Sequence, residues 1–371
     1  MERCFRGRCR GFTLVELAAV VGIAVSVGTV AAPMLDRSRS TVQGMSSEQN
    51  LRTIGRFSGM YAQDNGGAIF TYTWQPGVPY VNLRNGNPVV PGDEQIASSY
   101  ELRDILYRAT GRLEGIDRIR ASTLRLMQRR YSHLVLADYL GGIVSDEMWV
   151  DPADGRQLGW QSDPLGYLEG CDSENPVPYS CDPMPGSDTN FGWDELALRQ
   201  LWTFGSSYQI VPAAYLFDDR ATYVPNTDTP HLFSTAPGMG SQDDLVTQRS
   251  FHEVGFAHAK VMMFEEFDRD QGDPLYFANE FARSAKLMFD GSVNTFASGA
   301  ARRASYPVSS LVVPGEGRRD PQPFFQRYVP LDRFPDQPEV GKADEDQRYR
   351  WTYQGLLGLD YVQTYSGYGV R

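Results

Sequence analysis

Histidine and acidic side chains stand close together at residues 252–258, in the segment HEVGFAH. Two histidines one helical turn apart, with a glutamate beside the first, form the zinc-binding arrangement of many metalloproteases. Here the position one turn after His252 is Phe256, and His258 comes two residues too late to share its face. The spacing therefore argues against a catalytic zinc site.

A second acidic segment, FDRDQGD, contains Asp268, Asp270 and Asp273, and its residue types suit calcium. A calcium-binding EF-hand loop has its glycine at the sixth position, whereas Gly272 is the fifth residue counted from Asp268, so a solvated acidic turn fits better. The serine-containing segments lack the glycine frame of a hydrolase elbow, and the sequence has no glycine-rich phosphate loop. We therefore predict that the protein is not an enzyme and that it uses no metal and no cofactor.

One further acid, Glu16, lies inside an apolar run near the start of the chain. Residues 12–35 number about 24, and a spanning helix needs roughly 20, so this run predicts a transmembrane helix. Four arginines precede it against one glutamate, a bias typical of a cytoplasmic N-terminus. The alternative is a secretory signal peptide cleaved after the alanine-rich segment TVAAP. In a bilayer Glu16 would cost about 2.5–3.5 kcal/mol, so it needs a partner or access to water.

The residues RGFTLVELAAVVGIAV resemble the N-terminus of the type IV pilin and type II secretion pseudopilin superfamily. The resemblance implies a prepilin leader peptide over residues 1–11, which prepilin peptidase removes between Gly11 and Phe12, followed by N-methylation of Phe12. It also implies that Glu16 pairs with the Phe12 amine of a neighbouring subunit during assembly, although snorkelling of Glu16 to the membrane surface remains an alternative. Pro33 would bend the helix, because proline lacks a backbone donor and clashes with the preceding turn.

The helix is expected to continue beyond the membrane over residues 36–64. Leu51, Ile54, Phe57 and Tyr61 recur every three or four residues, which is a helical period, and the segment DNGG at 64–67 is a stop signal. The segment NLRTIG resembles the region that follows the membrane helix in the pilin-like proteins of planctomycetes and related bacteria. We therefore expect one long helix, the second half of which packs on a globular head.

Residues 65–371 are expected to form this head as an α+β domain with an antiparallel sheet. Apolar spacing predicts helices within 100–111 and 122–140 and strands within 206–217, 259–267 and 284–296. The pair Asp290-Gly291 lies between two apolar runs and predicts a hairpin turn. This hairpin resembles the C-terminal NVLFADGHV segment of the family, with Glu280 where a histidine is familiar. The segment MWVDPADGR resembles the family's CPSDP segment, with Val150 where a cysteine is common.

Two cysteines, Cys171 and Cys181, remain outside the expected leader, which contains Cys4 and Cys9. In an oxidising compartment the favoured arrangement is a disulfide between Cys171 and Cys181, and free thiols or a sparse metal site are alternatives. A zinc site would need four ligands, and no second pair of cysteine or histidine lies nearby in the sequence.

The composition excludes some partners and favours others. The 371 residues are 41% hydrophobic, which is enough for a packed core, and the formal net charge of -11 argues against nucleic-acid binding. The resemblance implies that the protein is a pilin-like or pseudopilin subunit, a minor component of a type IV pilus-like or type II secretion pseudopilus structure. Its expected partners are prepilin peptidase, other pilin-like subunits and inner membrane lipid. The expected location is the bacterial inner membrane, as a single-pass protein with a cytoplasmic N-terminus and a periplasmic or extracellular head.

Two other classes of function stay open. The first is a membrane-tethered binding module that recognises a polysaccharide or a secreted substrate through exposed aromatic residues such as Tyr72, Trp74 and Tyr80. These three residues also fit an ordinary core. The second is a tethered enzyme, although no group of residues in the sequence meets the geometric requirements of a catalytic site.

Overall fold

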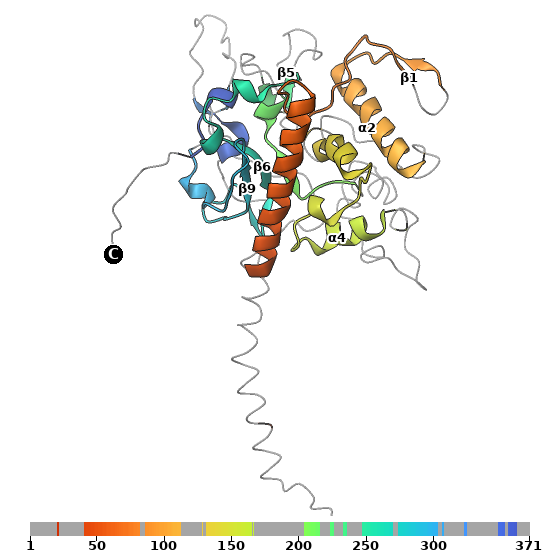
Figure 1. The fold of residues 1–371 in the computed structure, drawn as a ribbon. Coiled ribbons are helices and arrows are strands. Elements are labelled where there is room, and N and C mark those ends of the chain that lie inside the picture. Colours follow the sequence, from red (N-terminus) through yellow and green to blue (C-terminus); the bar gives the residue numbers. More distant parts are fainter. Residues whose placement is uncertain are drawn as a thin grey trace, which may run out of the picture.

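A long helix over residues 41–64 is the first extended element of the computed structural model (Figure 1). The structure describes residues 41–81, 86–112, 131–164, 204–215, 247–269, 274–302 and 355–361, with shorter stretches at 21, 128, 166, 223–225, 233–235, 306–307, 323–324 and 348–352. The helix ends before Gly66 and Gly67, which both have positive φ and are followed by buried residues 68–72. Its inward stripe includes Leu51, Ile54 and Tyr61, which are buried.

A four-stranded antiparallel sheet forms the centre of the head. The strands are β3 (Tyr208–Ile210), β6 (Val261–Glu265), β9 (Lys286–Met288) and β10 (Val293–Asn294), in the order β10-β9-β6-β3. Every residue of β6 and β9 is buried. Strands buried on both faces are typically apolar along most of their length, as β6 is, whereas β9 begins with the buried Lys286.

In the part of the chain that the structure describes, the remaining strands form four short antiparallel pairs. These are β1 (Tyr80–Val81) with β2 (Pro88–Val89), β4 (Tyr223–Pro225) with β5 (Phe233–Thr235), β7 (Phe267–Asp268) with β8 (Leu275–Tyr276), and β11 (Tyr306–Pro307) with β12 (Pro323–Phe324). Among the described residues, the other α-helices are α2 (Glu94–Thr110) and α4 (Gly155–Ser162). The 3-10 helices are η1 (Ser132–Leu140), η2 (Glu147–Trp149), η3 (Pro212–Ala214), η5 (Phe251–Glu253), η6 (Ala257–Ala259), η7 (Ser298–Ala300), η8 (Arg348–Trp351) and η9 (Gly355–Leu357).

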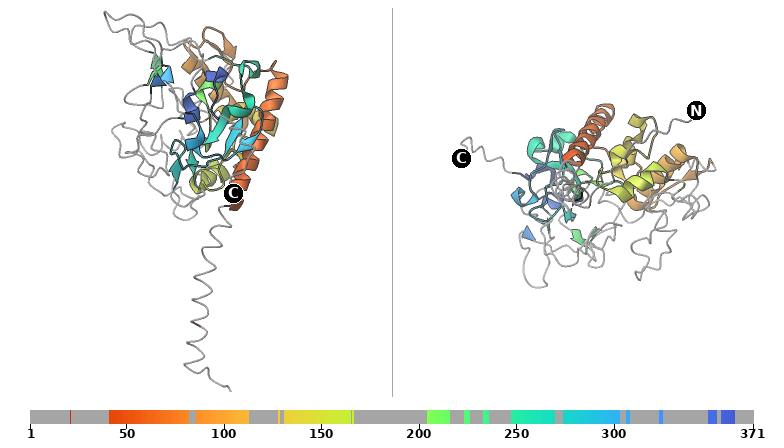
Figure 2. Two further views of the ribbon diagram at one scale, coloured as in Figure 1. Left: turned by 90° about the vertical axis from the view of Figure 1, so that its left-hand side faces the viewer. Right: turned by 90° about the horizontal axis from the view of Figure 1, so that it is seen from below.

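The long helix lies between the sheet on one side and α2 and α4 on the other (Figures 1 and 2). Gly55 permits the close approach to the sheet, because a Cβ at this position would come within 3.0 Å of Leu287 Cδ1 on β9. One turn further along, Ser58 donates a hydrogen bond to the sulfur of Met262 on β6. The helix is therefore a component of the head's core.

The prediction of a fold that begins with a transmembrane helix is wrong, and so is the single-pass inner membrane location that depends on it. Across the described ranges, the helices are too short or too polar to cross a bilayer. The long helix carries four charged residues that are exposed or half-buried, Glu48, Arg52, Arg56 and Asp64, because it packs on the head along one face only. The segment 12–35, on which the prediction rested, lies outside the described residues apart from position 21. What the structure supports is a mixture of helix and sheet.

Asp290 and Gly291 lie in the turn that joins β9 to β10, where Val293 pairs with Leu287. Gly291 has φ of 83°, a conformation that glycine adopts without steric cost. The Asp290 carboxylate accepts hydrogen bonds from the backbone N–H and the hydroxyl of Ser292. The turn is therefore held by its own side chains, as the Asp-Gly pair indicates.

Helix α2 is joined to the segment after the long helix by one buried acid, Glu101. Its carboxylate accepts hydrogen bonds from the backbone N–H of Thr73 at 2.6 Å and of Trp74 at 2.8 Å, and from the Thr73 hydroxyl at 3.1 Å. Burial raises the pKa of Glu101 to about 7, even though these hydrogen bonds lower it. Nearby, the Tyr72 hydroxyl donates to the carbonyl oxygen of Tyr131.

Candidate functional site

In its first half, the long helix contacts the head through three polar side chains as well as through its apolar stripe. Gln43 Nε2 donates to the Pro152 carbonyl at 3.2 Å, and Asn50 Nδ2 donates to the Val150 carbonyl at 3.0 Å. Between them, Ser47 Oγ lies 3.0 Å from the Tyr208 hydroxyl. These residues are spaced by four and then three positions, so they share one face of the helix. We call this contact, between Gln43, Ser47 and Asn50 on the helix and Val150, Pro152 and Tyr208 on the head, the helix seam.

Tyr208 is the shared partner in the helix seam. Its side chain is fully buried, and its hydroxyl donates to the Val150 carbonyl at 3.2 Å while it accepts from Asn50 at 3.3 Å. Because the Tyr208 proton is directed to Val150, Ser47 is the donor in their hydrogen bond. Burial and the negative charges of Glu265 and Asp151 raise the pKa of Tyr208 well above 10, so the hydroxyl stays protonated.

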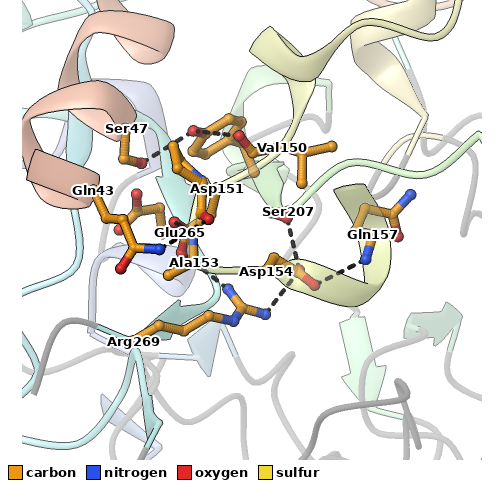
Figure 3. Close-up of polar contacts among 12 residues, drawn as sticks. Gln43, Ser47, Val150, Asp151, Ala153, Asp154, Gln157, Ser207, Glu265 and Arg269 are labelled. Carbon is orange, nitrogen blue, oxygen red and sulfur yellow. Dashed lines mark hydrogen bonds and ion pairs between the residues drawn. The ribbon is translucent and has the colours of Figure 1, made fainter. Parts of the chain in front are cut away.

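Behind the seam, a buried ion cluster fixes the loop that carries Val150 and Pro152. Arg269 Nη1 lies 3.2 Å from Asp151 Oδ2, and Arg269 Nη2 lies 2.9 Å from Asp154 Oδ2. The guanidinium points toward both carboxylates (Figure 3). Asp154 also accepts from the Ser207 hydroxyl and caps α4 through the backbone N–H of Gln157. We call Asp151, Asp154 and Arg269 the loop cluster.

The charges of the loop cluster hold the loop in position and do not prepare either carboxyl group for catalysis. Burial raises the pKa of Asp151, while the Arg269 charge and the hydrogen bond from the Ala153 N–H act in the opposite direction. Both carboxylates are engaged by the guanidinium, so neither is placed as a general base toward a nucleophile. Within the described ranges, His, Cys, Asp and Glu side chains do not gather in threes that could hold a metal ion. The arrangement orients the loop toward the helix.

Most residues that the sequence singled out for processing and assembly lie outside the described residues. These are Gly11, Phe12, Glu16 and Pro33, together with the two cysteines Cys171 and Cys181. Their roles and the proposed disulfide stay predictions. The predicted domain boundaries after residues 11, 35 and 64 likewise stay predictions.

The structure places the other candidates apart from the helix seam. His252 and His258 are exposed and stand in separate 3-10 helices, where Glu253 completes a capping box with Ser250. Asp268 is buried and accepts a hydrogen bond from the backbone N–H of Arg283 at 2.7 Å. Asp270 and Asp273 lie outside the described residues.

The aromatic group Tyr72, Trp74 and Tyr80 divides into two parts. Tyr72 is 3% exposed and belongs to the core, so its expected place on an exposed surface was wrong. Trp74 and Tyr80 are half-buried and stack on one another, with ring centroids 4.1 Å apart and an interplanar angle of 1°.

Sequence reasoning did not find the residues of the helix seam or the full loop cluster. The segment MWVDPADGR drew attention for its resemblance, but Arg269 is 115 residues away from Asp154 and no local pattern links them. A signal was present in the helix, because Gln43, Ser47 and Asn50 continue the face that contains Leu51 and Ile54. Polar residues on the inward face of a helix indicate buried polar partners.

In comparisons with known proteins, the chain matches no protein-family model, no curated protein and no solved structure.

Proposed function

We propose that this protein is a pilin-like or pseudopilin subunit that joins a filament through its N-terminal segment and carries its head as a rigid attachment. The observation that supports this most is the helix seam. The helix over residues 41–64, which follows the pilin-like segment in the sequence, is held to the head by Gln43, Ser47 and Asn50, in addition to its apolar stripe. A displacement of this helix would therefore move the head with it.

The resemblance at residues 10–25 supplies the second support. In the proposal, prepilin peptidase cuts between Gly11 and Phe12, and Glu16 then pairs with the Phe12 amine of a neighbouring subunit. The buried loop cluster would keep Val150 and Pro152 in place while the helix bears load, because paired and hydrogen-bonded charges resist local rearrangement.

Cross-linking between subunits in cells that carry the assembly apparatus tests this proposal. Glu16→Ala should reduce cross-linked multimers by tenfold or more, since one buried charge pair corresponds to about 1.4 kcal/mol or more. Glu48→Ala is a matched control, because Glu48 is a helix acid that pairs with Arg52 on the outer side of the helix. Equal multimer yields from Glu16→Ala and the unchanged protein would contradict the proposal.

A second candidate function is binding of a polysaccharide, and the stacked Trp74–Tyr80 pair is the observation that favours it. Half-buried aromatic rings offer flat apolar faces of the kind that sugar rings contact. Beside them, Val78 and Val81 are 42% and 61% exposed. In titrations of the protein with soluble polysaccharides, Trp74→Ala should abolish binding. Phe281→Ala is the control, because Phe281 is exposed on another part of the head.

A further inference from the structure

Lys260 and Asp360 meet in the interior although they are 100 residues apart in the sequence. Lys260 Nζ lies 3.2 Å from Asp360 Oδ2 and 3.4 Å from Oδ1, and the two side chains are 0% and 1% exposed. The hydroxyl of Thr352 contacts both the lysine nitrogen and Asp360 Oδ1. We call Lys260, Thr352 and Asp360 the C-terminal cluster.

The backbone holds this cluster in place from three sides. The Asp360 N–H donates to the Ala259 carbonyl at 3.0 Å, directly beside Lys260. The Asp360 carbonyl accepts from the Arg302 N–H at 2.7 Å, and the Val261 N–H donates to Asp360 Oδ2 at 2.8 Å. Amine and carboxyl are therefore held at contact distance, which removes the entropic cost of bringing two reactants together.

Burial of the pair works against the charged forms of both groups. Removing an ammonium and a carboxylate from water is costly, and their mutual attraction does not always repay it. Burial raises the pKa of Asp360, which increases the protonated fraction of the carboxyl group. A neutral amine beside a neutral carboxylic acid is a nucleophile beside its electrophile.

We propose that Lys260 Nζ and Asp360 Cγ condense to an intramolecular isopeptide bond. The amine lone pair attacks Cγ, the new C–N bond forms, and the bond from Cγ to Oδ1 breaks. One amine proton passes through the Thr352 hydroxyl to Oδ1, which leaves as water together with the proton that the carboxyl group already carried. The step needs no oxidant, reductant or further reactant.

The contacts assign different roles to the two carboxyl oxygens. Oδ2 accepts from the Val261 N–H, which would stabilise the negative charge that develops on this oxygen during attack, and it becomes the amide carbonyl. Oδ1 contacts the Thr352 hydroxyl, so it is the oxygen that can receive a proton and leave. Thr352 is thus a proton relay between the nitrogen and the leaving oxygen.

The other buried lysine of the sheet shows why the reaction is specific to Lys260. Lys286 Nζ donates to the carbonyl oxygens of Ser284 at 2.6 Å and Phe296 at 2.9 Å. Burial lowers its pKa to about 7, so a larger fraction of this amine than of an ordinary lysine is in the neutral form that a nucleophile requires. The two oxygens to which it donates, however, are peptide carbonyls, which are poor electrophiles compared with a protonated carboxyl group.

Mass spectrometry of the reduced full chain tests the proposal. The isopeptide bond removes one water, about 18 Da, and a tryptic digest should contain one branched peptide that joins Lys260 to Asp360. Lys260→Arg keeps a cation but cannot form the amide, so it should have the full mass. In Thr352→Val the full-mass form should accumulate, whereas the control Thr53→Val, on the long helix, should match the unchanged protein.

Two outcomes would overturn the proposal. The first is the full mass for the unchanged protein with separate Lys260 and Asp360 peptides, which would make the cluster an ordinary ion pair. The second is a mass loss without the branched peptide, which would place the dehydration elsewhere. Both readings come from the unchanged protein, so they stand even if a variant fails to fold. Neither bears on subunit assembly, which is tested separately through Glu16.

Discussion

The helix seam and the C-terminal cluster both attach a distant part of the chain to the central sheet, but they use different chemistry. In the helix seam, neutral groups meet, and the charges of Asp151, Asp154 and Arg269 lie one layer behind. In the C-terminal cluster, Lys260 and Asp360 are themselves the contact. Removal of one neutral hydrogen bond lowers the free energy of unfolding only a little. Removal of one member of a buried charge pair lowers it much more, because the other charge is left buried without its partner.

The difference follows from what each contact attaches. The long helix has its own hydrogen bonds and an apolar stripe, so polar contacts only need to set its orientation. The C-terminal segment, as described over residues 348–352 and 355–361, has two short 3-10 helices and places Tyr349 against Phe264 and Phe277. A segment with little regular structure of its own needs a stronger attachment, because the contact must offset the conformational entropy that the segment loses when it is ordered.

Asp360→Ala should give the largest effect, because it removes the attachment and leaves Lys260 buried without its carboxylate. We expect a loss of about 3–5 kcal/mol in the free energy of unfolding, by denaturant titration, from the stranded amine or from the opened 100-residue loop. Asp138→Ala, at an exposed acid, should change stability by less than about 0.5 kcal/mol. Similar curves for the two variants would show that the C-terminal cluster contributes little.

Arg269→Met tests the charged layer behind the helix seam. It leaves two buried carboxyl groups without their guanidinium, and we expect a loss of about 3 kcal/mol that becomes smaller at low pH, where the acids are protonated. The same titration at two pH values measures this. A loss that does not depend on pH would indicate that Arg269 acts through packing alone.

Glu101 offers a third kind of buried charge, one that is held mainly by backbone N–H groups. Its pKa is raised from 4.5 to about 7 in the folded protein, so between these pH values the folded state binds more protons than the unfolded state. The contribution of Glu101 to the free energy of unfolding is therefore fully present below pH 4.5. It is lost as the pH rises to about 7, and the total change is on the order of 3 kcal/mol. Glu101→Gln should flatten this part of the stability profile, and an unchanged slope would exclude Glu101 as its source.

Tyr208→Phe should have a smaller effect than the changes at charged groups, about 1–2 kcal/mol, because it removes neutral hydrogen bonds and leaves the ring in place. Ser47→Ala should cost about 1 kcal/mol, and the double variant should cost less than the sum, since both changes break the same hydrogen bond. Strict additivity in this double-mutant cycle would mean that Ser47 and Tyr208 do not interact in solution.

The sequence could predict features that depend on local pattern, and it could not predict contacts between distant residues. Four of the five residues of β6 are apolar, and the turn between β9 and β10 is an Asp-Gly pair, so both features can be recognised from adjacent residues. Lys260 and Asp360 are 100 residues apart and their pairing has no local signature. The transmembrane prediction over residues 12–35 relied on the length of the apolar run, on the arginines before it and on the family resemblance. The described helix, residues 41–64, is charged along its outer side.

The N-terminal residue of the protein isolated from its own cells tests the proposed function most directly. If the chain is a pilin-like subunit, prepilin peptidase removes residues 1–11, and N-terminal peptide mass spectrometry should find N-methylated Phe12 as the first residue. The same peptide should be absent when Gly11 is replaced by a bulkier residue. A chain that begins at Met1, or after Ala32 as a secretory signal peptide would leave it, would contradict the pilin-like function.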